Sequence, residues 1–160
     1  NNAGAALMPQ PVIEAVMRHL QLEMEIGGYE AATRAHRMLN RAYEVSAKLL
    51  GGQPDEIAIL ENATRAWDMA FYSLNFTKGD RILTCQSEYA SNYIAYLQTT
   101  RKTGCLIEAV PNDESGQIDV AALANLIDDR VKLISITHVP TNGGLVNPAA
   151  AVGGIAKKTN

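Results

Sequence analysis

The sequence predicts an α/β fold in which a mainly parallel sheet lies between two layers of helices, preceded by two N-terminal helices. Two observations predict it. Apolar residues recur at helical spacing over the first 50 residues, and from residue 55 onward short apolar segments alternate with helical ones. Strands that alternate with helices form parallel sheets, because the crossover helices cover both faces of the sheet.

Two amphipathic helices are expected at the start of the chain. Apolar side chains three and four positions apart predict a helix over residues 11–26, with Pro11 in the first turn, where proline is tolerated. A Gly-Gly pair interrupts this pattern, and a second helical pattern covers residues 29–50. We therefore assign residues 1–50 to an N-terminal helical segment and residues 51–160 to an α/β domain.

Four strands and four helices are expected in the α/β domain. The predicted strands are 57–60, 81–85, 105–110 and 131–136, and the predicted helices are 64–74, 89–101, 119–127 and 148–157. Asp119 is expected to cap its helix, because a side-chain oxygen at that position accepts hydrogen bonds from the free amides of the first turn.

Composition excludes several classes of partner. The 160 residues are 47% hydrophobic, which is enough to bury a core. A net charge of -3 without a basic patch argues against a nucleic-acid partner, and no apolar run approaches the roughly 18–20 residues of a membrane span. The start has no signal-peptide pattern, and Cys85 and Cys105 stand in apolar runs typical of buried reduced thiols. We expect a cytoplasmic protein.

Several chemistries lack their motifs. No glycine-rich dinucleotide or phosphate loop follows a strand, and no Gly-x-Ser-x-Gly elbow is present. The three histidines, His19, His36 and His138, lack metal-ligand spacing, and neither cysteine belongs to a Cys-x-x-Cys pair. No metal site is therefore expected.

Candidate ligand-binding residues follow the predicted strands, because ligands of open parallel sheets bind at the carboxyl ends of the strands. Asn62, Ala63 and Thr64 open a helix, where free amides and the helix dipole favour a phosphate. The alternative is an ordinary helix cap without a ligand.

The ends of two later strands carry further candidates. Tyr89 can offer an aromatic face to a flat ring, or it can be a packing residue. His138 can be a base or an orienting group, or a hydrogen-bonded structural histidine. Thr141 and Asn142 offer a hydroxyl and an amide to a ring substituent.

Together, these segments resemble the class V aminotransferases, the fold-type-I enzymes that use pyridoxal phosphate (PLP) and include cysteine desulfurases and isopenicillin-N-epimerase-like proteins. The resemblance extends over essentially the whole chain. It rests on Asn1-Asn2-Ala3-Gly4-Ala5, Glu61-Asn62-Ala63-Thr64-Arg65, Gly79-Asp80-Arg81-Ile82-Leu83 with Glu88-Tyr89-Ala90-Ser91-Asn92, and Ile136-Thr137-His138-Val139 with Gly144 and Asn147-Pro148.

The resemblance implies the roles of individual residues. The residues expected to bind PLP are Asn62, Ala63, Thr64, Tyr89, Thr141 and Asn142, and those expected on the substrate side are Asn2, Ala3, Tyr29 and His138. Either Thr141 or Asn142 would contact the ring hydroxyl. Tyr89 stands where many relatives have a histidine stacked on the ring, which suggests a branch away from typical cysteine desulfurases.

The resemblance also implies that the catalytic groups lie elsewhere. The Schiff-base lysine and the aspartate that pairs with the pyridine nitrogen are expected beyond Asn160, so residues 51–160 would be an incomplete PLP-binding large domain. The family's sheet has seven strands in the spatial order 3-2-4-5-6-7-1. This chain would supply strands 1 to 4, with strands 3, 2 and 4 side by side and strand 1 separated from them by a gap. We expect the fragment alone to be inactive.

Two hypotheses of function remain. The first is a fragment of a homodimeric PLP enzyme that acts on an amino acid by transamination, by desulfuration or C–S cleavage, or by epimerisation. The alternative is a non-catalytic α/β module that retains the fold for binding or dimerisation.

Overall fold

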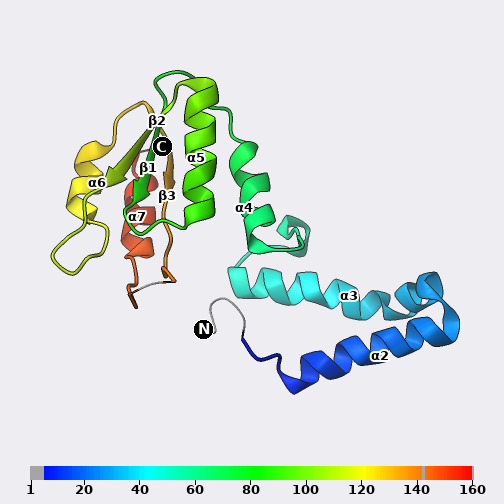
Figure 1. Ribbon diagram of the computed structural model, residues 1–160. Helices are drawn as coiled ribbons and strands as arrows, with labels where there is room; N and C mark the ends of the chain where they lie inside the picture. Colours follow the sequence, from blue (N-terminus) through cyan, green and yellow to red (C-terminus); the bar gives the residue numbers. More distant parts are fainter. Residues whose placement is uncertain (1–5, 142, 160) are drawn as a thin grey trace. The chain divides into compact units, whose positions relative to one another are not determined.

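A computed structural model of the chain describes residues 6–141 and 143–159. The chain forms two compact units, Asn1–Ile59 and Leu60–Asn160 (Figure 1). The first unit contains helices α2 and α3, and the second contains the sheet. The assignment of residues 1–50 to a helical segment and of residues 51–160 to a PLP-binding domain stays a prediction.

The first unit is a helical hairpin. Helices α2 (Gln10–Ile26) and α3 (Gly28–Leu50) pack against each other, as the apolar spacing predicts. Gly27 separates them with a φ of 88°, a conformation that side chains with a Cβ rarely adopt. Its amide donates to the Glu23 carbonyl and its carbonyl accepts from Ala31, so one residue both ends α2 and starts α3.

The segment after α3 differs from the prediction. A 3-10 turn, η1 (Pro54–Glu56), precedes residues 57–60, which form no strand. Ile59 is 58% exposed. The predicted buried strand at 57–60 is therefore wrong. The apolar residues are present, but a strand also needs a neighbouring backbone to pair with, and within the described residues this segment has none.

The second unit contains a parallel three-stranded sheet in the order β2-β1-β3. The strands are β1 (Arg81–Cys85), β2 (Leu106–Val110) and β3 (Val131–Ser135). The parallel sheet is confirmed. Strands β1, β2 and β3 correspond to strands 2, 3 and 4 of the family, so the order β2-β1-β3 agrees with the family order 3-2-4. In the described residues β3 pairs only with β1, and a groove of about 600 Å³ follows its outer side past Lys132 and Ile134.

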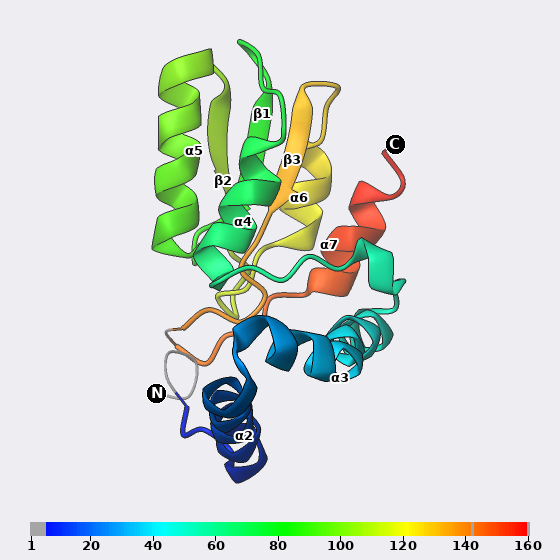
Figure 2. The ribbon, with the colours of Figure 1, turned by 90° about the vertical axis from the view of Figure 1, so that its right-hand side faces the viewer.

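Helices cover both faces of this sheet (Figure 1, Figure 2). The helices on one face are α4 (Ala63–Tyr72) and α5 (Ala90–Thr103), and those on the other are α6 (Val120–Leu126) and α7 (Ala149–Ala156). The predicted three-layer fold is confirmed. Asp119 caps α6 as expected, with its carboxylate accepting from the amides of Ala121 and Ala122.

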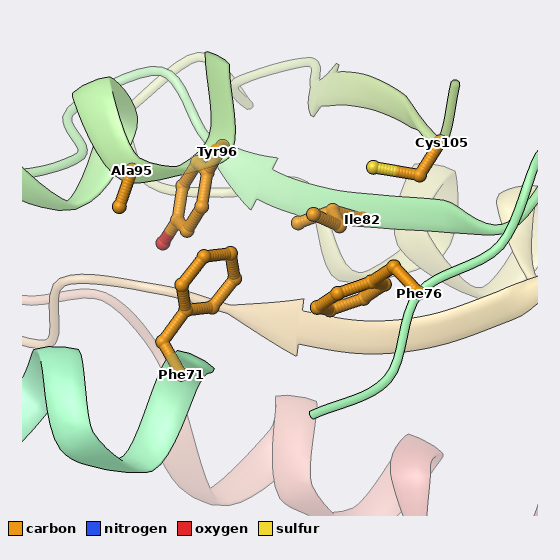
Figure 3. Packing of buried hydrophobic residues seen from close by; sticks show 6 residues of the cluster. All are labelled: Phe71, Phe76, Ile82, Ala95, Tyr96 and Cys105. Carbon is orange, nitrogen blue, oxygen red and sulfur yellow. The ribbon is translucent and has the colours of Figure 1, made fainter. Parts of the chain in front are cut away.

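The core consists of two clusters, one on each face of β1. Ile82 points toward α4 and α5 and packs with Phe71 and Tyr96 (Figure 3). Leu83 lies in the cluster on the α6 and α7 side. All five residues of β1 are buried, so this strand has no solvent-facing side. Cys85 and Cys105 are buried free thiols that form no disulfide with each other, as the apolar runs around them predict.

A buried arginine stabilises the amino end of the sheet. The Arg81 side chain is 10% exposed and pairs with Glu108 of β2 and with Asp128, the latter at 3.0 Å. It also donates to the Leu126 carbonyl at 2.8 Å. Hydrogen bonds from Arg130 and Arg81 lower the pKa of Asp128, so this carboxylate stays charged near neutral pH. Arg81 thus joins β1 to β2 and to the turn before β3.

Replacing Arg81 is expected to destabilise the second unit. Arg81→Ala should lower the free energy of unfolding by about 1–3 kcal/mol, because it removes the hydrogen bond to the Leu126 carbonyl and leaves Glu108 without its ion-pair partner. Urea unfolding measures this. The exposed Arg101→Ala is the matched control and should change stability by less than about 0.5 kcal/mol. Equal effects of the two variants would contradict a structural role for Arg81.

Candidate functional site

The candidate site lies at the carboxyl ends of the strands. In both views α4 and α5 begin at the end of the unit where the loop after β3 lies (Figure 1, Figure 2). Open parallel sheets bind ligands at this edge. The three segments that the sequence singled out in this unit, at residues 61–65, 86–92 and 137–148, therefore share one end of the fold.

The start of α4 is a capped helix terminus with open amides. Asn62 has extended backbone angles, and its side-chain oxygen accepts from the Arg65 amide at 2.9 Å. The cap interpretation is thus correct for the Asn62 side chain. The backbone amides of Ala63 and Thr64 have no acceptor within residues 6–141 and 143–159, and both residues are exposed. This turn can therefore donate to an anion in addition to being capped.

An ion pair flanks that turn. Glu61 accepts from the Arg65 side chain at 3.2 Å. A hydrogen bond from its own backbone amide, followed by the bond from Arg65, lowers the pKa of Glu61. Its negative charge would oppose a phosphate nearby, and the guanidinium of Arg65 offsets it.

Tyr89 lies at the start of α5 and is 52% exposed. Its amide donates to Glu88 Oε1 at 2.7 Å and to Thr137 Oγ1 at 3.1 Å. The hydroxyl of Thr137 in turn donates to the same carboxylate oxygen, which also accepts from the Asn92 side chain at 3.1 Å. The backbone of Tyr89 is thus bound to Thr137, near the start of the loop after β3, while 52% of the residue stays exposed.

The other oxygen of Glu88 faces the core. Glu88 Oε2 accepts from Thr84 Oγ1 at 3.0 Å and from the Tyr96 hydroxyl at 3.1 Å. The Tyr96 oxygen also lies 2.6 Å from Ser135 Oγ. Burial raises the pKa of Tyr96 far above its usual range, so the phenol keeps its proton and can donate it to the carboxylate while accepting from Ser135.

Asn147 closes the loop after β3 at its base. This side chain is 1% exposed. Its backbone amide donates to the His138 carbonyl and its side-chain amide to the Thr137 carbonyl, both at 2.7 Å. The side-chain amide also lies 3.3 Å from Ser87 Oγ, and its oxygen accepts from the Ile118 amide at 3.0 Å. One buried asparagine therefore connects the two ends of this loop and ties them to the segment after β1.

The structure brings some of the predicted residues together and leaves others apart. Tyr89 is joined to the loop that carries His138 and Thr141, and both of these side chains are exposed. Tyr29 belongs to the first unit, where its side chain is 92% exposed. The predicted site residues Asn2, Ala3 and Asn142 lie outside the described residues.

Two residues of this edge were not singled out as site residues from the sequence. Glu88 and Asn147 stand inside the segments that carry the resemblance, but neither was assigned a role. The available signal was a carboxylate directly before an expected helix and an asparagine directly before a proline. Both patterns are common, and only the folded chain shows how many partners each side chain has.

The described residues hold no group of three side chains that could bind a metal ion. Among the helices of the described residues, none combines the length and the apolar character needed to cross a membrane.

Comparisons with known proteins agree with these features. The sequence profile of the family "Aminotransferase class-V" matches residues 1–160. A probable cysteine desulfurase of Methanothermobacter thermautotrophicus is 28% identical over 157 residues, which are 96% of this chain and 39% of that protein. The chain therefore spans about two fifths of the length of this relative.

Solved structures of one similar protein, C-DES, match the fold. A C-DES variant with glycine covalently linked to the PLP cofactor has a TM-score of 0.86 at 20% identity, and the match covers 98% of this chain and 42% of that chain. The cystine C–S lyase C-DES in complex with its reaction product cysteine persulfide has a TM-score of 0.87 at the same identity and coverage. The profile match over the whole sequence confirms the resemblance: this chain belongs to the class V aminotransferase family.

Proposed function

We propose that this chain forms the phosphate- and ring-binding part of a PLP-dependent enzyme that acts on an amino acid. The proposal rests on three segments that lie at the same end of the sheet. They are the start of α4 with its free backbone amides, Tyr89 with its exposed side chain, and the loop after β3, whose two ends are joined by Asn147. The family match and the PLP named in a similar structure support it.

The residues present supply the chemical groups that PLP binding needs, namely open amides for the phosphate and an exposed aromatic ring for the pyridine. The amides of Ala63 and Thr64, with the Thr64 hydroxyl, would donate to the phosphate. The ring of Tyr89 would lie against the flat pyridine ring, and either Thr141 or Asn142 would contact its hydroxyl. PLP supplies an electron-withdrawing ring to the bound amino acid. This chain's own contribution is to bind and orient that ring.

The remaining residues of the site would contact the substrate or would come from other parts of the protein. His138 lies on the loop beside Tyr89, where it would face the substrate, and Asn2, Ala3 and Tyr29 are the other substrate-side candidates. The Schiff-base lysine and the aspartate partner of the pyridine nitrogen would come from sequence beyond residue 160. A homodimer and a cytoplasmic location are part of this proposal.

Among amino-acid substrates, the relatives favour cysteine, in contrast to the branch away from typical cysteine desulfurases that Tyr89 suggests. The 28%-identical relative is named as a probable cysteine desulfurase, and the similar structure is named as a cystine C–S lyase. Both names describe cleavage of a carbon–sulfur bond.

Sulfide release tests this choice of reaction. The full-length protein, supplied with PLP, L-cysteine and a thiol reductant, should release sulfide at a rate that rises with enzyme concentration. Alanine in place of cysteine is the control. PLP binding without sulfide release would contradict carbon–sulfur cleavage and leave transamination or epimerisation, whereas failure to bind PLP would overturn the whole proposal and favour a non-catalytic module.

Removing the Thr64 hydroxyl tests the phosphate contact. Thr64→Ala in the full-length protein should weaken PLP binding by the apoenzyme about tenfold or more, because a hydrogen bond to a charged group contributes about 1.5–3 kcal/mol. Equilibrium dialysis measures the Kd. Thr64→Ser keeps the hydroxyl and should stay within about threefold of the unmodified protein. An unchanged Kd for Thr64→Ala would place the phosphate elsewhere.

A further inference from the structure

We propose that Glu88 is the positioning residue of this site, and that its carboxylate sets the location of the Tyr89 ring relative to the loop that carries His138 and Thr141. The inference rests on the proposed function for its connection to PLP. The contacts that carry it exist in the chain itself.

One oxygen of Glu88 joins the two sides of the site. Oε1 accepts from the Tyr89 amide at 2.7 Å and from the Thr137 hydroxyl, and Thr137 Oγ1 lies 3.1 Å from the same amide. Three polar atoms from the start of α5 and from the end of β3 therefore contact one another. The Thr137 hydroxyl donates its single hydrogen to the carboxylate, and its oxygen accepts a hydrogen bond from the Tyr89 amide.

The second oxygen anchors the carboxylate in the core. Thr84 and Tyr96, which contact Oε2, are both 0% exposed. Tyr96 is also tied to Ser135, the last residue of β3. Because these partners lie in packed elements, the carboxylate has little freedom to rotate, and its other oxygen is held where it meets Tyr89 and Thr137.

The partners of Glu88 match a carboxylate. All five can donate a hydrogen bond, and a charged carboxylate only accepts. Among the described residues no lysine, arginine or histidine pairs with Glu88, so its polar contacts are hydrogen bonds from neutral donors. Charge-assisted bonds are roughly twice as strong as neutral ones, which makes this residue a firm link between β1, α5 and the loop.

Three variants of the full-length protein separate positioning from general stability. Glu88→Ala removes every contact of the carboxylate. Glu88→Gln keeps the size but makes the acceptor neutral. Arg81→Ala is the stability control, because it removes contacts at the amino end of the sheet and leaves all five partners of Glu88 in place.

The first readout needs no cofactor. Hydrogen exchange of the apo protein, followed by mass spectrometry on peptides that cover 86–92 and 137–147, reports the Tyr89 amide and the loop. Glu88→Ala should raise exchange there about tenfold, since it removes a hydrogen bond worth about 1–1.5 kcal/mol. Glu88→Gln should raise it at least about threefold, because a neutral acceptor binds more weakly. Arg81→Ala should lower Tm while leaving exchange in these peptides within about twofold, because every contact of Glu88 remains.

The second readout is the Kd for PLP. Glu88→Ala should weaken binding about tenfold or more, because a misplacement of about 1 Å in a binding site is costly, and Arg81→Ala should change it less than about threefold. The proposal is overturned if Glu88→Ala and Arg81→Ala raise exchange and Kd alike, or if both Glu88 variants match the unmodified protein. If Glu88→Ala does not fold, Glu88→Gln decides by the same criteria.

The two proposals fail in different ways. An unmodified protein that binds no PLP overturns the proposed function, while the exchange of the apo variants still decides whether Glu88 positions Tyr89 and the loop. Normal PLP binding by the unmodified protein and by both Glu88 variants overturns the positioning role and leaves the proposed function intact.

Discussion

The burial of β1 on both faces and along both edges is the constraint on which the second unit depends. Its residues alternate between two cores, with Ile82 packed toward α4 and α5 and Leu83 toward α6 and α7. Parallel pairing to β2 and β3 fixes the direction of all three strands. Because the strands run the same way, their carboxyl ends face one edge, and the segments that follow β1 and β3 meet there without being adjacent in sequence.

Beyond the strand ends, two polar side chains continue the connection that backbone pairing makes within the sheet. Glu88 links the segment after β1 to Thr137, two residues after the end of β3, and Asn147 ties both ends of the 137–148 loop to Ser87. Burying such groups is costly unless their hydrogen bonds are made, so each holds its surroundings in one arrangement. The exposed groups of the proposed site, the Tyr89 ring and the His138 and Thr141 side chains, are attached to these two rigid points.

Much of this fold follows from local sequence. Short, largely apolar segments predict β1 and β3, and Asp119 caps its helix as its position suggests. The segment 57–60 shows the limit of such reasoning, because apolar composition does not supply a pairing partner. Glu88 shows another limit. Its hydrogen-bond partners range from Thr84 to Thr137, so no short stretch of sequence contains them all. The aromatic side chain of Tyr89 next to it is a more obvious candidate for ligand binding.

A crystal structure of the full-length protein with PLP bound tests the central claim most directly. We expect the phosphate within hydrogen-bond distance of the Ala63 and Thr64 amides, the pyridine ring against the face of Tyr89, and Thr141 or Asn142 within hydrogen-bond distance of the ring hydroxyl. A phosphate bound away from the start of α4, or a ring that does not touch Tyr89, would contradict it.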